Sequence, residues 1–284
     1  MRELCVITGA AGGIGLAAAK IVGRDHSVVI SDVSEARLDA AATELRSLGV
    51  ECKPVVVDVT NHDSVAELVC ESEAFGTVAS VIHTAGVSPS MGSAELIIRI
   101  NALGTVNVNE AFYRLLEEGF AIVNVASMAA HTFPRVLVPK GRFKYALRNQ
   151  DVFVKKMTSA CNVVPTKMRP GFAYSISKNF VTWYCSSQAA RFGERGGRIV
   201  SVSPGTIDTP MGRLEERAGS GAMLHYAALK RFGRPEEVAE LLAFCADTKA
   251  SYMTGVDIAC DGGVLAAFTM RDMIAVARNT RQLQ

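Results

Sequence analysis

Residues 4–15 read Leu-Cys-Val-Ile-Thr-Gly-Ala-Ala-Gly-Gly-Ile-Gly, an apolar run that ends in a glycine-rich turn. The run Leu4–Thr8 is typical of a buried strand in a parallel sheet. A helical pattern follows over Gly15–Val22. Glycine permits positive φ and lets a bound group approach the backbone, so the turn can hold a pyrophosphate at the N-terminus of a helix. Its place between a first strand and a first helix predicts a dinucleotide site.

Short apolar runs alternate with helical patterns along the rest of the chain. Six further runs are predicted as buried strands: Ser27–Ser31, Lys53–Val57, Val78–Thr84, Phe120–Val125, Arg198–Val202 and Gly255–Ala259. Helical periodicity occupies Glu35–Leu48, Ser64–Ser72, Ala94–Leu116, Tyr174–Phe192 and Pro235–Cys245. Such alternation implies right-handed crossovers. We therefore expect an α/β protein, one Rossmann domain over residues 1–284, with a doubly wound seven-stranded parallel sheet and helices on both faces.

Composition excludes several classes of protein. The chain has 284 residues, 49% of them hydrophobic, and a net charge of +2. This length suits one large α/β domain, and the small charge does not suggest nucleic acid as a partner. No apolar run approaches a membrane span, and the first strand begins too early to leave room for a signal peptide. The seven cysteines lack metal-type spacing, so we expect a cytoplasmic protein with reduced thiols and no metal.

The second predicted strand ends in Asp32, and this carboxylate bears on the choice of dinucleotide. A carboxylate at this place accepts both hydroxyls of an adenosine ribose and repels a 2′-phosphate. None of Ala10, Ala11 and Val33 is basic, so these positions offer no cation to such a phosphate. The sequence therefore favours NAD over NADP. Asp32 and Ser34 are about equal candidates for capping the next helix.

Tyr174 and Lys178 are four residues apart in a helical pattern, which places a phenol and an ammonium on one face. A nearby positive charge lowers the pKa of a tyrosine toward the range useful for proton transfer. Beside a nicotinamide ring, such a pair is suited to moving a proton together with a hydride. Alone, the spacing is weak evidence, because an exposed pair of this kind arises easily by chance.

Taken together, the motifs resemble the short-chain dehydrogenase/reductase family, over the whole chain up to about Gly263. The glycine turn resembles the family's Thr-Gly-x-x-x-Gly-x-Gly loop, and the turn at 83–86 resembles its Asn-Asn-Ala-Gly with both Asn replaced. The matching positions are Thr8, Gly9, Gly13, Ile14, Gly15, Asp58, Val59, Ala85, Gly86, Asn101, Ser127, Tyr174, Lys178, Pro204, Gly205, Ile207 and Thr209.

The resemblance implies a role for each matching residue. Tyr174 is the acid in ketone reduction and the base in alcohol oxidation, and Lys178 lowers its pKa and holds the nicotinamide ribose. Ser127 binds the reacting oxygen, and Asn101 links Lys178 to solvent through water. Besides the glycine turn, NAD is held by Asp32, Val33, Asp58, Val59, Ala85 and Gly86, and its carboxamide by Pro204, Gly205, Ile207 and Thr209. His83 and His131 are interpreted as structural.

The main departure from the family is the distance between Ser127 and Tyr174, which are 47 positions apart, much farther than in most members. The insert, residues 128–173, joins the strand that carries Ser127 to the helix that carries Tyr174. Its root therefore lies at the substrate site, where a long connection is usually functional or disordered. Its apolar content predicts a folded lid with a helix around Tyr145–Ser159.

The insert is also strongly basic, with nine Lys and Arg against the single acid Asp151 between His131 and Ala173. One interpretation is a basic rim that attracts an anionic substrate, such as a carboxylate or an acyl thioester. The other is a solvated helix whose cations face acidic patches of the same fold or of a neighbouring subunit. A membrane-surface role is less favoured.

The insert and the sequence of residues 250–263 resemble the bacterial 3α-hydroxysteroid dehydrogenase/carbonyl reductase branch of the family. This branch implies a bulky, largely apolar alcohol or ketone as the substrate. Residues 210–234 are expected to close over it. Residues 264–284 are predicted to form an amphipathic helix. Family members are usually homodimers or homotetramers, and the insert adjoins the second of the two helices that form their interfaces, so the resemblance leaves the oligomeric state open.

The sequence thus predicts an NAD(H)-dependent oxidoreductase that interconverts a secondary alcohol and a ketone, with a bulky apolar or amphipathic substrate that is steroid-like or anionic. One alternative is an NAD-sensing regulatory protein without turnover, against which the set Ser127, Tyr174, Lys178 and Asn101 argues. Another is an epimerase or dehydratase of sugar nucleotides, which requires a larger substrate domain and another glycine spacing.

Overall fold

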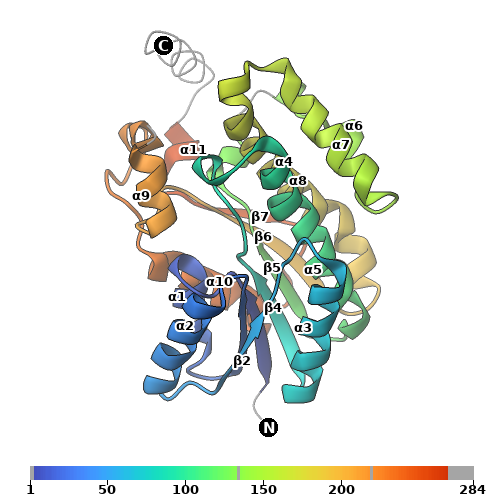
Figure 1. Ribbon diagram of the computed structural model, residues 1–284. Helices are drawn as coiled ribbons and strands as arrows, with labels where there is room; N and C mark the ends of the chain where they lie inside the picture. Colours follow the sequence, from blue (N-terminus) through green and yellow to red (C-terminus); the bar gives the residue numbers. More distant parts are fainter. Residues whose placement is uncertain (1–2, 133–134, 218–219, 268–284) are drawn as a thin grey trace.

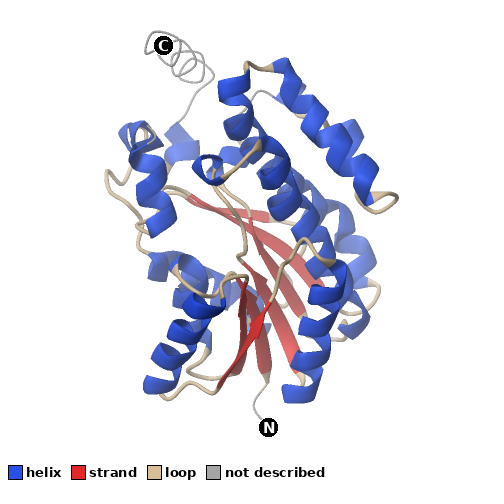
Figure 2. Cartoon of the chain, viewed as in Figure 1, coloured by secondary structure: helices blue, strands red, loops and turns tan. Residues whose placement is uncertain are grey.

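A single parallel sheet organises the chain in the computed structural model, which describes residues 3–132, 135–217 and 220–267 (Figures 1 and 2). Its seven strands lie in the order β3-β2-β1-β4-β5-β6-β7. Their bounds are β1 Leu4–Thr8, β2 Ser27–Asp32, β3 Cys52–Val56, β4 Val78–His83, β5 Ala121–Val125, β6 Arg198–Pro204 and β7 Asp257–Cys260. The strand order reverses between β1 and β4, which confirms the predicted doubly wound α/β fold.

Helices cover both faces of the sheet, as predicted (Figure 1). The helices on one face are α1 Gly13–Val22, α2 Glu35–Ser47 and α10 Pro235–Ala246. The helices on the other face are α3 His62–Phe75, α4 Ala94–Ile98, α5 Gly104–Phe112 and α8 Arg169–Gly193. Each face has its own hydrophobic core, because strands buried on both sides direct alternate apolar residues to opposite faces.

A row of polar side chains crosses the second core, near the carboxyl ends of β1, β4 and β5, in the middle of β6 and at the start of β7. Its members occupy one register in five adjacent strands, namely Thr8, His83, Asn124, Ser201 and Asp257. All but Asp257 are fully or almost fully buried, and they are hydrogen-bonded within the fold. The apolar interior therefore ends at this row, and the residues that follow it along the strands are placed for chemistry.

The predicted helix Ala94–Leu116 is one helical run in which the α-helical hydrogen-bond pattern is interrupted. It consists of α4, a π-helical turn η2 over Arg99–Leu103, α5, and the short 3-10 turn η3 over Tyr113–Leu115. A π-turn adds a residue to the helix and is frequent at functional sites. Here it contains Asn101, which is buried. The apolar periodicity of the segment gave no sign of this interruption.

The insert is folded, as predicted, although its helix begins later than expected. It contains η5 Arg135–Leu137, α6 Lys140–Phe143, α7 Gln150–Ala160, η6 Cys161–Val163 and η7 Thr166–Met168. Helix α7 starts at Gln150 because the side chain of Asn149 accepts a hydrogen bond from the Val152 N–H, 2.9 Å away, and so caps the helix. Helix α8 starts at Arg169, earlier than Tyr174, with Pro170 in its first turn.

Several short elements connect the larger ones, and all of them except η9 lie toward the carboxyl edge of the sheet. They are η1 Pro89–Met91, η4 Met128–Ala130, α9 Pro210–Arg217, η8 Ser220–His225, η9 Thr248–Ala250 and α11 Val264–Ala267. The amphipathic helix predicted for residues 264–284 lies outside the described residues beyond Ala267. No helix in the described part of the chain is both long and apolar enough to cross a membrane.

Candidate active site

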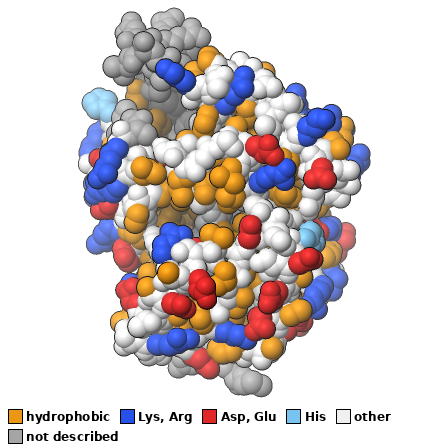
Figure 3. Space-filling model, viewed as in Figure 1, with side chains coloured by type: hydrophobic (Ala, Val, Ile, Leu, Met, Phe, Trp, Pro, Cys, Tyr) orange, Lys and Arg blue, Asp and Glu red, His pale blue; other side chains and the backbone are white. Residues whose placement is uncertain are grey.

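The residues predicted to form the site gather at the carboxyl edge of the sheet. Gly9 follows β1, Ala85 and Gly86 follow β4, Ser127 follows β5, and Gly205 follows β6. In open α/β sheets, ligands bind at this edge where the strand order reverses. Figure 3 shows apolar side chains around a hollow on the corresponding part of the surface. We refer to it as the active-site hollow.

The glycine turn has the close backbone packing that its sequence predicts. Gly9 has a φ of +70°, and a Cβ built on it would be 2.7 Å from the Ala85 backbone. A Cβ on Gly15 would be 2.4 Å from the Gly9 carbonyl oxygen. Helix α1 has no side-chain cap and no acid in its first turn. Its N–H groups and its positive end therefore suit a pyrophosphate.

The same turn lies close to the segment predicted to hold the nicotinamide end. A Cβ on Gly13 would be 3.3 Å from the methyl carbon of Thr209. The Thr209 hydroxyl accepts a hydrogen bond from the Gly212 N–H, 3.0 Å away, at the start of α9. Gly205 packs against the Asp261 backbone, where a Cβ would be 2.7 Å from Cα. The fold thus brings the two predicted ends of the cofactor site together.

Asp32 lies at the end of β2 and has a cationic neighbour that the sequence interpretation missed. Its side chain is 12% exposed, and Oδ1 accepts hydrogen bonds from the Ser34 N–H at 3.1 Å and from the Arg37 guanidinium at 3.0 Å. The expectation that nothing near Asp32 could hold a 2′-phosphate is therefore wrong. Arg37 is in the first turn of α2, and a cation five positions after the acid is the sequence signal that would have revealed it.

The predicted adenine contacts are arranged differently from each other. Asp58 Oδ1 accepts hydrogen bonds from the backbone N–H and the hydroxyl of Thr60, both at 2.8 Å, so this carboxylate closes its own turn. Val59 is buried against Gly104, and its carbonyl oxygen accepts a bond from Asn107 at 2.9 Å. Val33 is exposed. Thus Asp58 and Val33 remain accessible at the surface, whereas Val59 is part of the packing beneath.

Ser127, Tyr174 and Lys178 meet between the end of β5 and α8. Ser127 is at the start of η4, where its Oγ accepts a hydrogen bond from the Ala129 N–H at 3.1 Å. Lys178 is one helical turn after Tyr174, and its Nζ is 6.0 Å from the centre of the tyrosine ring. That ammonium donates a bond of 2.8 Å to the carbonyl oxygen of Val125, the last residue of β5. The predicted pair thus lies side by side, with Lys178 buried and Tyr174 partly buried.

The pKa values of this group differ from the sequence-based expectation. Burial lowers the pKa of Lys178 to about 8. Burial raises the pKa of Tyr174; hydrogen bonding to Ser127 lowers it, and the negative charge of Glu215 raises it. The prediction that the lysine lowers this tyrosine pKa is therefore wrong for this structure, because desolvation of the phenolate outweighs the favourable contacts.

Asn101 is brought next to Lys178 by the π-turn and by a glycine. Its side-chain amide pairs with the backbone of Val87, accepting from N–H at 2.8 Å and donating to the carbonyl at 2.9 Å. A Cβ on Gly86 would be 3.1 Å from Asn101 Oδ1 and 3.4 Å from Lys178 Nζ. Ser177 is a further neighbour of the amide, at 3.4 Å. Gly86 therefore lets the two polar groups approach from either side.

His83 and His131 both have partners in the fold. The ring Nδ1 of His83 is 2.7 Å from the Thr8 hydroxyl, and burial, followed by the charge of Lys178, lowers its pKa to about 3. This ring is therefore neutral near pH 7 and does not act as an acid. His131 Nε2 is 2.7 Å from the Asp257 carboxylate. Both contacts agree with structural roles.

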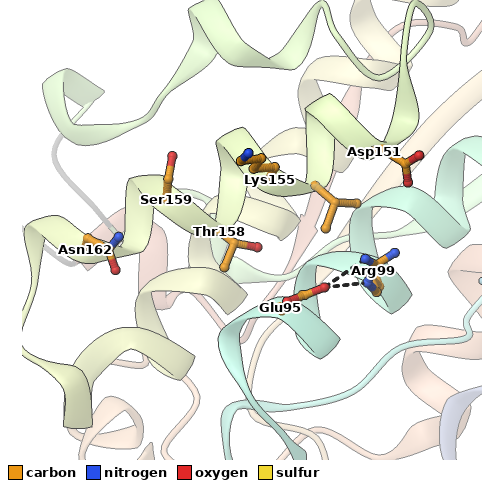
Figure 4. Close-up of a pocket in the computed structure, with 8 residues that line it drawn as sticks. Glu95, Arg99, Asp151, Lys155, Thr158, Ser159 and Asn162 are labelled. Carbon is orange, nitrogen blue, oxygen red and sulfur yellow. Dashed lines mark hydrogen bonds and ion pairs between the residues drawn. The ribbon is translucent and has the colours of Figure 1, made fainter.

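The insert is anchored on the helix that carries Tyr174. Phe143 of α6 and Phe153 of α7 contact Phe180 of α8, with ring centres 5.3 and 4.8 Å apart, and Phe143 also contacts Trp183. Between α4 and α7 the surface forms a groove of about 360 Å³ (Figure 4). Figure 4 shows the Arg99–Glu95 ion pair at one wall of the groove and Lys155 at the other.

The positive charge of the insert is not neutralised by the described part of the fold. None of the basic side chains from Lys140 to Arg169 lies within ion-pairing distance of a described carboxylate. Lys156 lies over the Tyr145 ring, and Arg142 donates to Ser159 Oγ at 2.9 Å near the end of α7. The interpretation in which these cations face acidic patches of the same chain therefore has no support among these residues.

One charged residue of the site was not singled out from the sequence. Glu215 of α9 accepts a hydrogen bond from the Ser90 N–H of η1 at 3.1 Å. The sequence interpretation considered only the apolar residues of the segment 210–234. An acid in a segment expected to close over a substrate was the available signal, whereas its position near Tyr174 depends on the fold.

Comparison with known proteins gives a consistent result. The sequence model described as "short chain dehydrogenase" matches residues 3–139, and the one described as "Enoyl-(Acyl carrier protein) reductase" matches residues 152–265. The chain is 32% identical to the short-chain dehydrogenase/reductase bsc3 of Alternaria brassicicola over 270 residues, which cover 94% of this chain and 97% of that protein.

Two further proteins are similar to this chain over most of its length. The 3-oxoacyl-[acyl-carrier-protein] reductase FabG of Thermotoga maritima is 30% identical over 267 residues, covering 93% of this chain and 98% of that protein. The crystal structure of a short chain dehydrogenase from Burkholderia cenocepacia in complex with NADP superposes with a TM-score of 0.73 at 24% identity, covering 92% of this chain and 97% of that one. The second similarity concerns the fold alone.

Proposed function

The chain belongs to the short-chain dehydrogenase/reductase family of oxidoreductases, and on this premise we propose that it interconverts a secondary alcohol and a ketone with NAD(H). The observation that carries the proposal is the meeting of Ser127, Tyr174 and Lys178 beside the glycine turn. The nicotinamide ring supplies or accepts the hydride when the cofactor is bound. The residues of the chain bind the substrate and move the proton.

In the proposed reaction, Tyr174 exchanges the proton of the reacting oxygen. The Ser127 hydroxyl holds that oxygen and stabilises the charge that develops on it. The raised pKa of Tyr174 keeps the phenol protonated near neutral pH, the form that serves as the acid in ketone reduction. In alcohol oxidation the same oxygen takes the hydroxyl proton, and this direction gains as pH rises.

Lys178 and Asn101 act behind the tyrosine in this proposal. With a pKa of about 8, Lys178 is able to give up a proton and regain it near neutral pH. Asn101 adjoins Lys178 across Gly86, which supports a path for protons from the lysine toward solvent. Lys178 also offers an ammonium to the ribose hydroxyls of a bound nicotinamide nucleotide. His83 takes no part, because its imidazole stays neutral.

The residues present fit a nicotinamide dinucleotide. Gly9, Gly13 and Gly15 form a cradle that a Cβ would fill, and the uncapped end of α1 faces it. For NAD rather than NADP, the support is the Asp32 carboxylate, whose Oδ1 already bonds Ser34 and Arg37. Because the Arg37 guanidinium would favour a 2′-phosphate, we propose that the preference for NAD is moderate.

The cofactor preference is tested by binding. We expect the wild-type protein to bind NADH more tightly than NADPH, and Asp32→Ala to reverse or erase that preference. Arg37→Ala is the matched variant on the other member of the ion pair and should weaken NADPH binding more than NADH binding. Fluorescence titration of the three proteins with both cofactors gives the six affinities. A wild-type preference for NADPH contradicts the proposal.

We propose a bulky apolar or amphipathic substrate. The support is the set of exposed apolar side chains on the elements near the active-site hollow, including Met91 of η1, Leu96 of α4 and Leu214 of α9. The cations of the insert are placed to attract an anionic part of such a molecule from solution. A screen that compares neutral steroids with carboxylate and acyl-thioester alcohols tests this choice. Turnover confined to small polar alcohols contradicts it.

Family membership also bears on the alternatives. An epimerase or dehydratase of sugar nucleotides and a regulatory NAD sensor without turnover are not favoured, since the relatives named above are described as dehydrogenases or reductases and the chain contains every residue of the predicted catalytic set. We further propose a homodimer or homotetramer in the cytoplasm, where the cysteines, most of them buried, remain reduced. Light scattering in solution determines the assembly, and a monomer contradicts that part.

The catalytic assignment is tested with Tyr174→Phe on a panel of secondary alcohols. Loss of the proton-transfer group is expected to reduce NADH production by about 10² to 10⁴-fold, with NADH affinity preserved. Tyr252→Phe is the control, because Tyr252 is fully exposed. Unchanged turnover in Tyr174→Phe contradicts the assignment and revives the regulatory alternative.

A further inference from the structure

Glu215 joins two segments that are far apart in the sequence. It belongs to α9, within the segment 210–234 predicted to close over the substrate, and its Oε1 accepts a hydrogen bond from the Ser90 N–H at 3.1 Å. Ser90 is in η1, four residues after Gly86. Helix α9 packs against η1, and this hydrogen bond fixes the carboxylate at that contact. Its position is thus defined by backbone on one side and by its own helix on the other.

The charge of this carboxylate is not balanced by the described residues. Of the two arginines of the same helix, Arg213 pairs with Asp208 at 2.6 Å and with Glu216 at 3.1 Å. No cation in the described part of the chain lies within ion-pairing distance of Glu215. The two adjacent acids of α9 therefore differ, because Glu216 is neutralised by a neighbour and Glu215 is not.

The contact with η1 also places Glu215 near the reacting groups, because η1 packs against α8, the helix that carries Tyr174 and Lys178. In agreement with this position, the negative charge of Glu215 raises the pKa of Tyr174. A carboxylate that acts on this phenol acts on a substrate bound to it as well. A hydrogen-bond donor of the substrate gains a charge-assisted bond there, whereas a second negative charge is repelled.

We propose that Glu215 is a specificity-determining residue, which selects substrates that carry a neutral hydrogen-bond donor near the reacting carbon over substrates that carry a carboxylate there. This inference rests on the proposed oxidoreductase function and deepens it. The proposal gives the two ends of the substrate different charge requirements. A negative group is tolerated only at the end remote from the reacting carbon, where the cations of the insert are available, and the end next to Tyr174 is neutral.

The test compares two ligands that differ by one charge. The ring alcohols 4-hydroxycyclohexanecarboxylate and 4-hydroxycyclohexanecarboxamide hold a hydroxyl and a second group at the same separation, with similar shape. Calorimetric titration into the protein saturated with NADH measures binding without turnover, since neither alcohol reacts with the reduced cofactor. We expect the wild-type protein to bind the amide about tenfold more tightly than the carboxylate, because Glu215 repels the ligand's carboxylate in a partly screened site.

Two variants assign the effect to Glu215. Glu215→Gln removes the charge and keeps an acceptor for Ser90, and should reduce the preference for the amide to less than about threefold. Glu216→Gln removes the neighbouring charge and should leave the wild-type preference intact. Equal binding of the two ligands to the wild-type protein, absence of binding included, overturns the proposal. So does a preference that survives in Glu215→Gln or is lost equally in Glu216→Gln.

Turnover separates this inference from the proposed function. If the wild-type protein with NAD oxidises neither these alcohols nor any other secondary alcohol, the proposed function is wrong. The ligand preference in the binding experiment is then still decisive for Glu215. If oxidation proceeds and the preference for the amide is absent, the oxidoreductase function stands and the role of Glu215 is wrong.

Discussion

The glycine turn and the insert differ in how each is held in place. The turn is fixed by backbone against backbone, with Gly9 and Gly15 packed so closely that a single methyl group would collide. The insert is fixed by side chains, through the contacts of Phe143 and Phe153 with Phe180. A site formed by close backbone packing is compatible with few sequences, so it is easily recognised in a sequence. An aromatic contact can be formed by many sequences. The two regions should therefore respond differently to substitution.

The largest difference is expected from glycine substitutions. Gly15→Ala would place a carbon 2.4 Å from the Gly9 carbonyl oxygen, so the turn must shift. Losing one or two hydrogen bonds to a charged phosphate, at about 1.5–3 kcal/mol each, weakens NADH binding about a hundredfold. Gly141→Ala in α6 meets nothing within 4 Å and should leave affinity unchanged. Fluorescence titration measures the NADH affinity of each variant. Equal affinities in both variants would contradict the expected difference between the turn and the insert.

A large effect of another kind is expected in the insert. Phe153 is fully buried, and Phe153→Ala should lower the free energy of unfolding by about 3–5 kcal/mol, with NADH affinity changed less than about twofold because the turn is elsewhere. Val163→Ala in η6 is the control, since Val163 is 68% exposed. Urea unfolding gives the stabilities. A matching loss of NADH affinity would mean that the two regions are not independent.

The buried ammonium predicts a pH-dependent stability on the catalytic side. The pKa of Lys178 is about 8 in the folded protein against 10.5 ordinarily, so the unfolded chain binds more protons between these values. The contribution of this group to the free energy of unfolding therefore rises with pH across that window. The destabilisation caused by burying the charged ammonium is at its full size below pH 8. Lys178→Met should stabilise the protein by up to about 3 kcal/mol near pH 7 and by less near pH 9.5.

Urea unfolding at the two pH values measures this difference. Lys249→Met is the control, because that side chain is 77% exposed and should give the same stability as the wild-type protein at both pH values. A gain for Lys178→Met that does not shrink at the higher pH would contradict the assigned cause.

The smallest expected effect concerns the pH dependence of turnover. If Tyr174 is the base in alcohol oxidation, as proposed, the rate rises as its phenol ionises, and the negative charge of Glu215 opposes this ionisation. Glu215→Gln removes a negative charge, so the apparent pKa of the rising limb should move to lower pH. Glu216→Gln should leave the limb in place. A shift in the opposite direction in Glu215→Gln would exclude an electrostatic effect on the phenol.

The sequence predicted the sheet well and the substrate side less well, for a physical reason. Strands such as Leu4–Thr8 and glycines such as Gly9 are determined by local sequence, so their roles can be predicted from neighbouring residues. The ion pair between Arg37 and Asp32, the π-turn around Asn101 and the position of Glu215 near Tyr174 depend on contacts between separate elements. Local patterns do not contain these contacts. The raised pKa of Tyr174 likewise follows from burial, which spacing does not report.

The attachment of the insert has a consequence for how this scaffold can be altered. The chain leaves the sheet after β5, and between η4 and α8 the extra segment packs against both α8 and α4. Its contacts are an aromatic cluster on Phe180 and Trp183, further buried apolar residues of α7, and the hydrogen bond from Gln150 to Asn107. A graft that replaces this segment must keep these inward contacts, whereas the exposed surface and its charge are free to vary.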